Sequence, residues 1–584
     1  MKLRRLWMMA WMLAALSLLG GCSADKNGPD LDSLPPLVYG APQATELIAY
    51  QSGENQLQQE GVQQVRTVLD SGKLEGGAGY VIYQDGEMVI TGGSVIKNLA
   101  AEEILRPRLD KITSIVFGEG LISVGDKACE GMDKVQTVRF EGDTRSIGRY
   151  AFSGCTALTS VSFGTGMNEI GERAFYECRA LKDVELTGQI TSVGDYAFSG
   201  CTSLASAVVG SSVQHLGQSP FQGCTSFVSL SVDTNAMGKA FQGCTSLQIV
   251  TLGEHVTGVS EYAFSGCTGL STVQYAPSVT SIGNFAFSGC TALTDMEIPK
   301  EIVRVGSHAF SGCTGLYEVR FPARETLKLD NHAFSDCTML YGISFPQGMN
   351  LQMSSGVFDG CTGLYSVALP QDAVSSLGDS AFSGCTALKE ILFPQTGTVT
   401  VGDSVFSGCT ALESVAFTPA VVSVGSSLFE NCSTLKDVTF SPAMTQIGAN
   451  LFSGCSSLRS MTVDVPRITG EMFSGHTALE SITFGQSVQI IESNAFLGCT
   501  GVRQLVLPEG VTEVHDEAFS GCRSVTKVVM PKSLTHLGVR VFYGCDQITY
   551  FYRGTEHAWN RLTGSKMHWR EGAARRGVTF NYKL

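Results

Sequence analysis

The sequence predicts a solenoid, a stack of similar coils in which each coil adds one strand to a continuous parallel β-sheet. Three observations predict it: a cysteine recurs in steps of mostly 23 or 24 residues, a short strand pattern follows each cysteine, and one unit is too small to fold alone. The recurring cysteines are Cys155, Cys178, Cys201, Cys224, Cys244, Cys267, Cys290, Cys313, Cys337, Cys361, Cys385, Cys409, Cys432, Cys455, Cys499, Cys522 and Cys545.

Each unit has the same order of signals, and the one at residues 147–163 reads IGRYAFSGCTALTSVSF. Val161 and Phe163 alternate with serines, and this period of two is typical of a half-buried strand. Gly154 is suited to a turn that needs a positive φ or a close approach of two backbones. Because one unit buries too little apolar surface to offset the entropy of ordering it, neighbouring units must stack.

A unit of this length, with a Leu-x-x-Val-x-Phe strand and a cysteine at a fixed position, is typical of a leucine-rich-repeat coil. The full pattern, Ile-Gly-x-x-Ala-Phe-x-x-Cys-x-x-Leu-x-x-Val-x-Phe/Leu-Pro, resembles the BspA-like leucine-rich-repeat family over residues 109–553. We therefore expect about 20 repeats in a curved right-handed coil, with the parallel sheet on the concave face and short helical or irregular turns on the convex face. The resemblance implies a microbial surface protein, since some members are tied to adhesion and host-protein binding.

The first 22 residues have the organisation of an export signal. Lys2, Arg4 and Arg5 precede an apolar stretch at residues 6–19, and small residues lead to Cys22. The segment resembles a bacterial lipoprotein signal, which implies that residues 1–21 are removed and that Cys22 is lipidated. An ordinary signal peptide that ends near a cysteine is one alternative. A retained transmembrane helix is another, although about 14 apolar residues are short for a bilayer.

Two segments connect the signal to the repeats. Residues 22–53 contain several prolines among Ser, Asp and Gly, and we interpret them, with the lipidated Cys22, as a flexible tether. Residues 54–108 are expected to form an N-terminal cap, because solenoid ends expose apolar edges. Apolar residues at near-helical spacing from about Glu54 to Asp70 predict a short amphipathic helix, either packed on the first coil or loosely attached.

The rest of this cap, and the C-terminal cap, are predicted from strand and aromatic patterns. Residues 80–83 and 88–91 are two apolar runs around an Asp-Gly turn, which predicts a β-hairpin. Residues 554–584 leave the repeat pattern, and we expect a C-terminal cap that ends in a strand. Trp559 and Trp569 are interpreted as residues that pack in this cap, with ligand contact as the alternative.

One cysteine per coil, always at the same angle, predicts a column of reduced and buried thiols. Neighbouring side chains would point the same way, which is poor disulfide geometry even though the Cα spacing allows it. Cysteine also packs well as a small buried apolar residue. Disulfides, which are usual in exported proteins, and a metal-binding row are the alternatives; no Cys or His cluster has the spacing of a metal site. His476 replaces one cysteine, which we interpret as local degeneration, with a ligand role second.

Repeat lengths vary at two kinds of place. The 20-residue step ending at Cys244 and the 21-residue step ending at His476 are shortened on the side opposite the strand, and we expect small changes of curvature there. The four successive 24-residue steps from Cys313 to Cys409 carry an extra residue in the same outer region.

The composition and the known motifs argue against several functions. The net charge is −14 and the repeats hold no run of Lys or Arg, so no nucleic-acid partner is expected. No nucleophile-elbow, zincin, P-loop or dinucleotide-binding motif falls on a suitable element, so we predict no catalytic residues, cofactors or metal. His308 and His332 hold equivalent places in consecutive repeats and are interpreted as surface residues, with a metal-binding or pH-sensing pair as the alternative.

The strongest indication of binding is on the outward sheet face near the middle of the repeats. Tyr317, Tyr341 and Tyr365 occupy the position before three successive strands, and Arg320 and Leu392 are outward residues nearby. Tyrosine offers rigid contact area with a polar tip, which suits protein or glycan recognition. Repeat duplication and sheet stability are the alternative explanation of the three tyrosines.

These observations predict an exported, membrane-anchored and non-catalytic surface protein. Its expected partners are host extracellular proteins or glycans, together with the membrane through a lipid anchor. A second hypothesis is a structural spacer or assembly component of the cell envelope, which has envelope partners and no soluble ligand. An enzyme with its site in residues 23–108 or in the C-terminal tail is a third.

Overall fold

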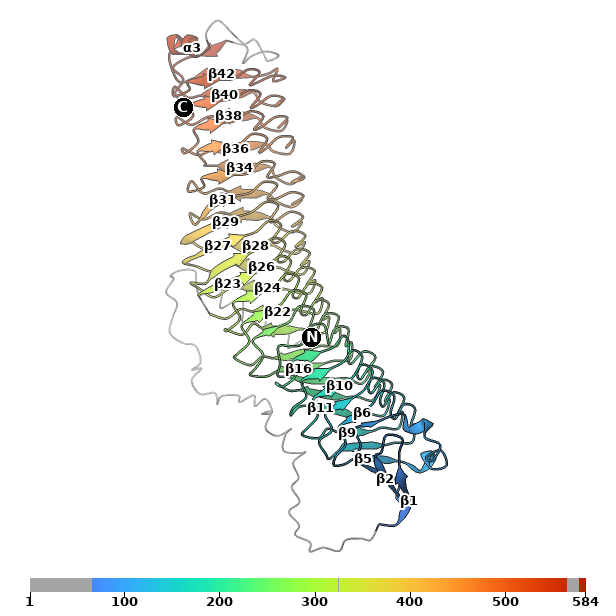
Figure 1. Cartoon of the computed structure of the whole chain (residues 1–584). Coiled ribbons are helices and arrows are strands. Elements are labelled where there is room, and N and C mark those ends of the chain that lie inside the picture. Colours follow the sequence, from blue (N-terminus) through green and yellow to red (C-terminus); the bar gives the residue numbers. More distant parts are fainter. Residues whose placement is uncertain (1–65, 324, 564–576, 584) are drawn as a thin grey trace, which may run out of the picture. The chain divides into compact units, whose positions relative to one another are not determined.

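The computed structural model describes residues 66–323, 325–563 and 577–583. The chain divides into two units, Met1–Val65 and Arg66–Leu584, and only the second contains described residues. The predicted tether, Cys22 and Trp569 therefore lie outside the described residues. In the second unit, successive coils stack one on the next from β5 near its beginning to β42 near its end (Figure 1).

Each coil contributes a main strand, which follows the cysteine and contains the Val-x-Phe pattern. The main strands pair in parallel with main strands of neighbouring coils, in five successive sheets rather than one unbroken sheet. They are β5 (Ser114–Phe117), β7 (Thr137–Phe140), β9 (Ser160–Ser162), β11 (Asp183–Leu186), β13 (Ser206–Val209), β15 (Ser229–Val232), β16 (Ile249–Leu252), β18 (Thr272–Gln274), β20 (Asp295–Glu297), β22 (Glu318–Arg320), β24 (Gly342–Ser344), β26 (Ser366–Ala368), β28 (Glu390–Leu392), β30 (Ser414–Ala416), β32 (Asp437–Thr439), β34 (Ser460–Val463), β36 (Ser481–Phe484), β38 (Gln504–Val506), β40 (Lys527–Met530) and β42 (Thr549–Tyr552).

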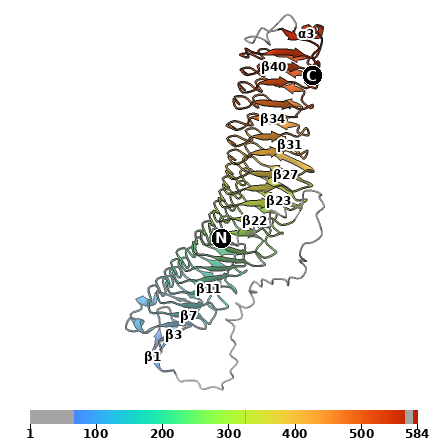
Figure 2. The same ribbon diagram turned by 180° about the vertical axis from the view of Figure 1, so that it is seen from behind.

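Most coils also carry a second strand just before the next turn, which the sequence analysis did not predict. These second strands form their own parallel ladder, visible beside the main strands in Figure 2. They are β6 (Ser123–Val124), β8 (Ser146–Ile147), β10 (Glu169–Ile170), β12 (Ser192–Val193), β14 (His215–Leu216), β17 (Gly258–Val259), β19 (Ser281–Ile282), β21 (Arg304–Val305), β23 (Thr326–Leu329), β25 (Asn350–Met353), β27 (Ala373–Leu377), β29 (Gly397–Val401), β31 (Val421–Val424), β33 (Gln446–Ile447), β35 (Arg467–Ile468), β37 (Ile490–Ile491), β39 (Glu513–Val514) and β41 (His536–Leu537).

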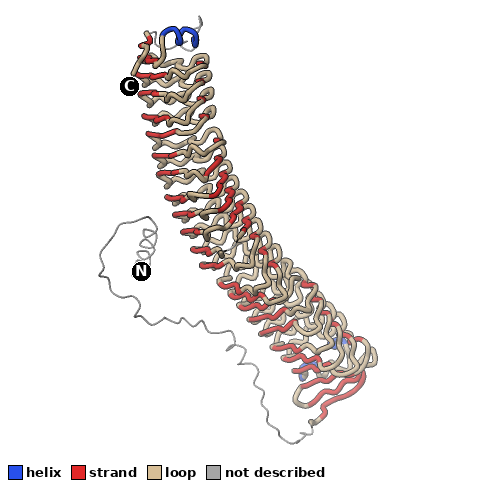
Figure 3. Tube along the Cα trace, turned by 90° about the vertical axis from the view of Figure 1, so that its left-hand side faces the viewer, coloured by secondary structure: helices blue, strands red, loops and turns tan. Residues whose placement is uncertain are grey.

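The predicted fold class is confirmed: the described residues form a parallel β-solenoid of about 20 coils with little helix. Within these residues, helix occurs only near the two ends, as η2 (Leu99–Ala101), η3 (Leu109–Lys111) and α3 (Glu556–Thr563) (Figure 3). The turns of the coils are irregular rather than helical.

The length of a repeat affects its second strand, although β31 has four residues in a 23-residue step. The shortened step ending at Cys244 has no second strand, and the second sheet is interrupted there between β14 and β17. The sheet is interrupted again between β33 and β35, at the step ending at His476. In the four 24-residue coils the second strands β23, β25, β27 and β29 have four or five residues instead of the two found in the 23-residue coils before them. The extra residue therefore widens the second sheet.

The turn side of each coil has a third ladder of backbone hydrogen bonds. The N–H groups of Tyr150, Phe152 and Gly154 donate to carbonyls of the next coil over 3.0, 2.7 and 2.8 Å, while the intervening Ala151 and Ser153 donate within their own coil. This alternation needs two left-handed residues, and φ is 56° at Tyr150 and 75° at Gly154. Glycine adopts such a φ without the steric cost that a Cβ brings, which explains the Ser-Gly-Cys spelling.

The core of the stack contains a continuous column of phenylalanine rings. Phe152 and Phe175 are stacked with centroids 5.1 Å apart, Phe175 and Phe198 at 5.2 Å, and the column continues to Phe542. These rings are fully or almost fully buried. Near-parallel rings at this spacing attract beyond their area of burial, so the column adds specific contacts between coils.

The cysteines form a second buried column beside these rings, and every described cysteine is free and buried. Most of the described thiols donate to a carbonyl of the preceding coil, as Cys178 Sγ does to Phe152 O over 3.1 Å and Cys290 Sγ to Phe264 O over 3.2 Å. His476 has the same partner as the cysteine that it replaces, because its Nε2 contacts Phe452 O. The position therefore provides one donor that satisfies a buried carbonyl.

The structure at the N-terminal end differs in one respect from the sequence prediction. Residues 79–91 form an antiparallel hairpin of β2 (Gly79–Tyr83) and β3 (Glu87–Thr91), and β3 pairs in parallel with β5. The predicted helix from about Glu54 to Asp70 is wrong at its end, because Val68 to Asp70 belong to strand β1 (Val68–Lys73), which pairs with β2. The free edge of β2 supplies backbone partners that override the weak helical spacing; the earlier part lies outside the described residues. A two-residue strand, β4 (Val95–Ile96), begins the second ladder.

At the C-terminal end the chain forms α3 and then β43 (Val578–Thr579), which pairs with β42. Trp559 on α3 is 6% exposed, and its ring lies 5.0 Å from that of Tyr552. The helix was not predicted, because residues 556–563 offer only a short amphipathic segment.

The burial of the thiol column leads to a prediction about how readily the cysteines react. Burial raises the pKa of Cys155 to about 12, and of Cys313 likewise, so the reactive thiolate is scarce at neutral pH. We expect a thiol-specific colour reagent to modify none of the 18 described cysteines in the folded chain and all of them in guanidinium chloride. Rapid labelling of several thiols in the folded chain, or failure to label them after unfolding because they are oxidised, would contradict a reduced and buried column.

A candidate ligand-binding surface

The three predicted tyrosines form a stack on the outer side of the main sheet. The rings of Tyr317 and Tyr341 are 5.7 Å apart and those of Tyr341 and Tyr365 are 5.5 Å apart, with interplanar angles of 11° and 9°. Their backbones are linked too, since the N–H of Tyr341 donates to Tyr317 O and that of Tyr365 to Tyr341 O. An equal 24-residue spacing in a parallel ladder places the three side chains in one line, and we call them the tyrosine column.

The column is partly open to solvent. Tyr317 is 45% exposed and Tyr341 is 39% exposed. Partial burial and the adjacent phenols raise the pKa of Tyr341, so its hydroxyl stays a neutral donor at physiological pH. The ammonium of Lys389 lies 5.5 Å from the centre of the Tyr365 ring, within the range of a cation–π contact. Lys389 occupies the tyrosine position in the next repeat, and the sequence analysis missed it.

The other two predicted residues lie on a neighbouring row of the same sheet. Cross-strand pairing places Arg320, Ser344, Ala368 and Leu392 side by side on four successive strands. Arg320 and Leu392 are therefore three strand spacings apart, about 14 Å, and do not touch. Arg320 makes an exposed ion pair with Glu318 over 3.0 Å.

Two exposed apolar side chains widen this surface. Leu392 is 50% exposed, and Met339, two residues before Tyr341, is 57% exposed. Met339 was not predicted, although its place before a tyrosine of the column could have been read from the repeat alignment. Exposed apolar and aromatic side chains concentrated in neighbouring coils are typical of interaction surfaces. The tyrosine column, Met339, Arg320 and Leu392 are together the candidate binding surface.

The two equivalent histidines belong to a second stack, on the turns. The rings of Tyr262, Phe285, His308 and His332 stack with centroids 4.7, 4.7 and 4.9 Å apart. Each of these residues has a left-handed φ and precedes the Ala-Phe or equivalent pair of its coil. We call this set the turn column. Its ring faces are covered by one another, so it offers a ligand only ring edges.

The described residues show no metal site and no membrane-spanning helix. No group of three or more His, Cys, Asp or Glu side chains in the described ranges could hold a metal ion. No helix in the part of the chain that the structure describes is long and apolar enough to cross a bilayer. The predicted export signal lies outside that part.

The geometry is that of a leucine-rich-repeat solenoid. A family model described as "BspA type Leucine rich repeat region (6 copies)" matches residues 108–228, 234–364, 351–477 and 466–556. The matched segments cover more than half of the chain, so it belongs to the BspA-type leucine-rich-repeat family, and the predicted resemblance is confirmed.

Solved structures include relatives of low identity. A leucine-rich repeat protein from Bacteroides ovatus is 26% identical, with a TM-score of 0.47, and the match covers 61% of this chain and 87% of that one. A leucine rich cell surface protein from Faecalibacterium prausnitzii is 22% identical, with a TM-score of 0.30 and coverage of 71% and 95%. A search of curated proteins gives no significant match.

The position of His308 in the turn column leads to a prediction about how the stability of the fold depends on pH. Burial, and then the neighbouring His332, lower the pKa of His308 below its ordinary 6.5, and Asp336 opposes this only in part. Because the folded state favours the neutral ring, the stability that His308 contributes is complete above about pH 6.5 and is lost as the pH falls below it. We expect the urea midpoint to fall less between about pH 7 and pH 5 in His308→Phe than in the unmodified chain.

Phenylalanine is the matched replacement because Phe285 already occupies the equivalent position with a φ of 53°. Carboxylates that titrate over this range affect both proteins equally and cancel in the comparison. An equal loss of stability in the two proteins would show that His308 does not sense pH.

Proposed function

We propose that this protein is an exported, non-catalytic surface lipoprotein that uses the outer face of its main sheet to bind protein or glycan ligands in adhesion or cell–cell contact. The observation that carries the proposal is the tyrosine column, a rigid aromatic surface with Leu392 and Met339 exposed nearby. Membership of a family of repeat surface proteins supports a binding role. A solenoid presents such a surface without needing conformational change.

The energetics favour this surface over the rest of the sheet. Tyrosine and arginine are enriched among residues that dominate binding energies, and tyrosine loses little conformational entropy when it is covered. The stacked rings are fixed by their neighbours, so most of the ordering cost is met before a ligand arrives. Arg320 and Glu318 provide a charged rim beside the aromatic surface, and Lys389 adds a cation next to Tyr365.

The anchor is the second part of the proposal. The basic residues, apolar stretch and small residues before Cys22 support removal of residues 1–21 and lipidation of Cys22. More than one acyl chain would hold the protein stably at a membrane, because a single chain binds only marginally. The proline-containing segment that follows would separate the repeats from the bilayer.

Changing the tyrosine column to alanine tests the binding surface. We expect Tyr317→Ala, Tyr341→Ala and Tyr365→Ala together to weaken ligand capture at least tenfold, since loss of three central aromatic contacts exceeds about 1.4 kcal/mol. The measurement is capture of extracellular-matrix proteins, mucins and the cell's own envelope by the full-length chain, followed by titration of the ligand found. A matched control changes Tyr150, Tyr196 and Tyr262 on the turns to alanine.

Undiminished capture by the column variant, with the fold retained by circular dichroism, would remove this surface from the proposal. Self-association or envelope fractionation without saturable binding would instead support the structural-spacer hypothesis.

The anchor is tested by Cys22→Ser, which cannot carry the lipid. We expect the unmodified protein to sediment with membranes and to have a mature N-terminus at residue 22 with an added acyl mass. The variant should leave the membrane fraction or retain its signal segment. An unmodified Cys22 in the mature chain, or cleavage elsewhere, would show an ordinary signal peptide.

A further inference from the structure

The extra residue in the four 24-residue coils produces a surface that the other coils lack. In the 23-residue coils before them, a two-residue second strand has one outward side chain, as in β19, where Ser281 is partly exposed and Ile282 is buried. In β23 and β25 the longer strand has two outward side chains that alternate with buried Leu327 and Leu351. A single row of side chains thus becomes two parallel rows.

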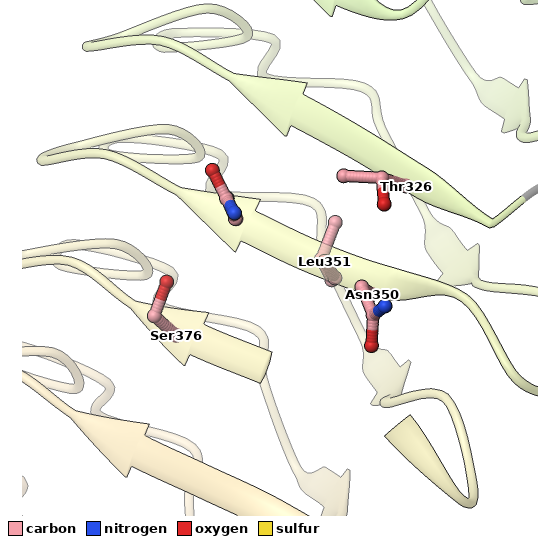
Figure 4. Close-up of a pocket in the computed structure, with 5 residues that line it drawn as sticks. Thr326, Asn350, Leu351 and Ser376 are labelled. Carbon is pink, nitrogen blue, oxygen red and sulfur yellow. The ribbon is translucent and has the colours of Figure 1, made fainter. Parts of the chain in front are cut away.

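The two rows are in register across neighbouring strands. The first contains Lys328, Gln352, Ser376 and Thr400, paired strand to strand. In the second, Thr326 pairs with Asn350 across β23 and β25, and Thr398 on β29 pairs with Val374, which holds the position of this row on β27. We call the seven polar residues of the two rows the polar strip. Thr326, Asn350, Leu351, Gln352 and Ser376 line a shallow depression of about 270 Å³ on it (Figure 4).

The chemistry of the strip is neutral and able to hydrogen-bond. Six of its seven residues are Thr, Ser, Asn or Gln, whose side chains both donate and accept. The one charge, Lys328, is paired with the buried carboxylate of Asp330 over 3.4 Å, which also pairs with Arg304 over 2.6 Å. No acidic residue lies on β23, β25, β27 or β29, although the whole chain has a net charge of −14.

Exposed polar groups are free to meet a ligand here. The side chains of Thr326, Gln352, Thr398 and Thr400 are exposed to solvent. No described residue of these four strands is an exposed large apolar side chain. A protein partner needs apolar or aromatic anchors for most of its binding energy, so the strip is poorly suited to one.

The distances between the polar side chains of the strip favour a ligand with a matching repeat length and width. Neighbouring strands are about 4.8 Å apart, which is close to the length of one hexose in an extended polysaccharide. The two rows are two residues apart along each strand, about 7 Å, which is close to the width of a sugar ring with its hydroxyl groups. A glycan running along the stack would meet a pair of polar residues on β23, β25 and β29, and the single polar residue Ser376 on β27.

We propose that the polar strip binds a neutral, hydroxyl-rich polysaccharide chain, laid across strands β23 to β29 with one sugar in the depression between β23, β25 and β27. The site is on different strands from the tyrosine column and does not depend on the function proposed for that surface. The neutral strip matches an uncharged ligand, while the acidic chain as a whole disfavours an anionic one.

The test uses the full-length chain in affinity electrophoresis with a soluble β-glucan, a xylan and a mannan, and with polygalacturonate as an anionic comparison. We expect at least one of the three neutral polysaccharides to retard the chain. The combined variant Thr326→Ala, Gln352→Ala and Thr400→Ala should bind it at least tenfold more weakly. Ser376→Trp, which fills the depression with a bulky side chain, should weaken binding similarly.

The matched control is Ser460→Ala, Thr462→Ala and Thr483→Ala, which removes three exposed hydroxyls from main strands β34 and β36. It should bind like the unmodified chain, and circular dichroism confirms that each variant folds. The proposal is overturned if none of the neutral polysaccharides retards the chain, if polygalacturonate alone does, or if both strip variants bind normally. The tyrosine-column variant should retain polysaccharide binding; its loss there, with strip variants unaffected, would assign the glycan to the tyrosine column.

Discussion

Every regular coil depends on one backbone arrangement, a residue with left-handed φ two positions before the buried phenylalanine. Tyr196, Tyr262 and Ser404 are examples, with φ of 55°, 58° and 54°. For an L-residue this conformation costs roughly 1–2 kcal/mol. It is stabilised because alternate N–H groups then reach carbonyls of the next coil, while the phenylalanine ring packs on its neighbour. The strained residue is therefore stable only in a stack, which is the physical reason that one repeat cannot exist alone.

The regular period makes much of the core predictable from the sequence. Cys267 and Cys290 are one repeat apart in the sequence, so they hold the same position in successive coils. The thiol column can therefore be predicted from the repeat spacing alone. The second ladder could not be predicted in the same way. A strand of two residues, such as β19, has no periodicity to detect, and its pairing follows only from the stacking of whole coils. Strand β1 was missed for a related reason, since it forms on an edge that only the folded hairpin provides.

The sequence predicts where the residues of the candidate binding surface lie, but not which of their side chains are in contact. The 24-residue spacing aligns Tyr317 with Tyr341, yet ring stacking depends on side-chain rotamers that spacing does not determine. Lys389 was missed because its role comes from the ring before it, not from its own residue type. Arg320 and Leu392 were correctly placed on the outward face, but the register separates them by three strands.

Repeat length, more than residue type, explains why two surfaces occur in the same coils. A single extra residue disturbs a parallel stack unless the next coil follows the same path, and the register of β29 against β31 shifts where the 24-residue coils end. Four successive coils share the insertion, so each extended strand finds an equally extended neighbour, as Leu329 does in Met353. Where a coil is shortened instead, at Cys244, the second strand disappears and its ladder is interrupted. An insertion that four successive coils share keeps their extended strands paired, and this repetition places polar side chains in an ordered array.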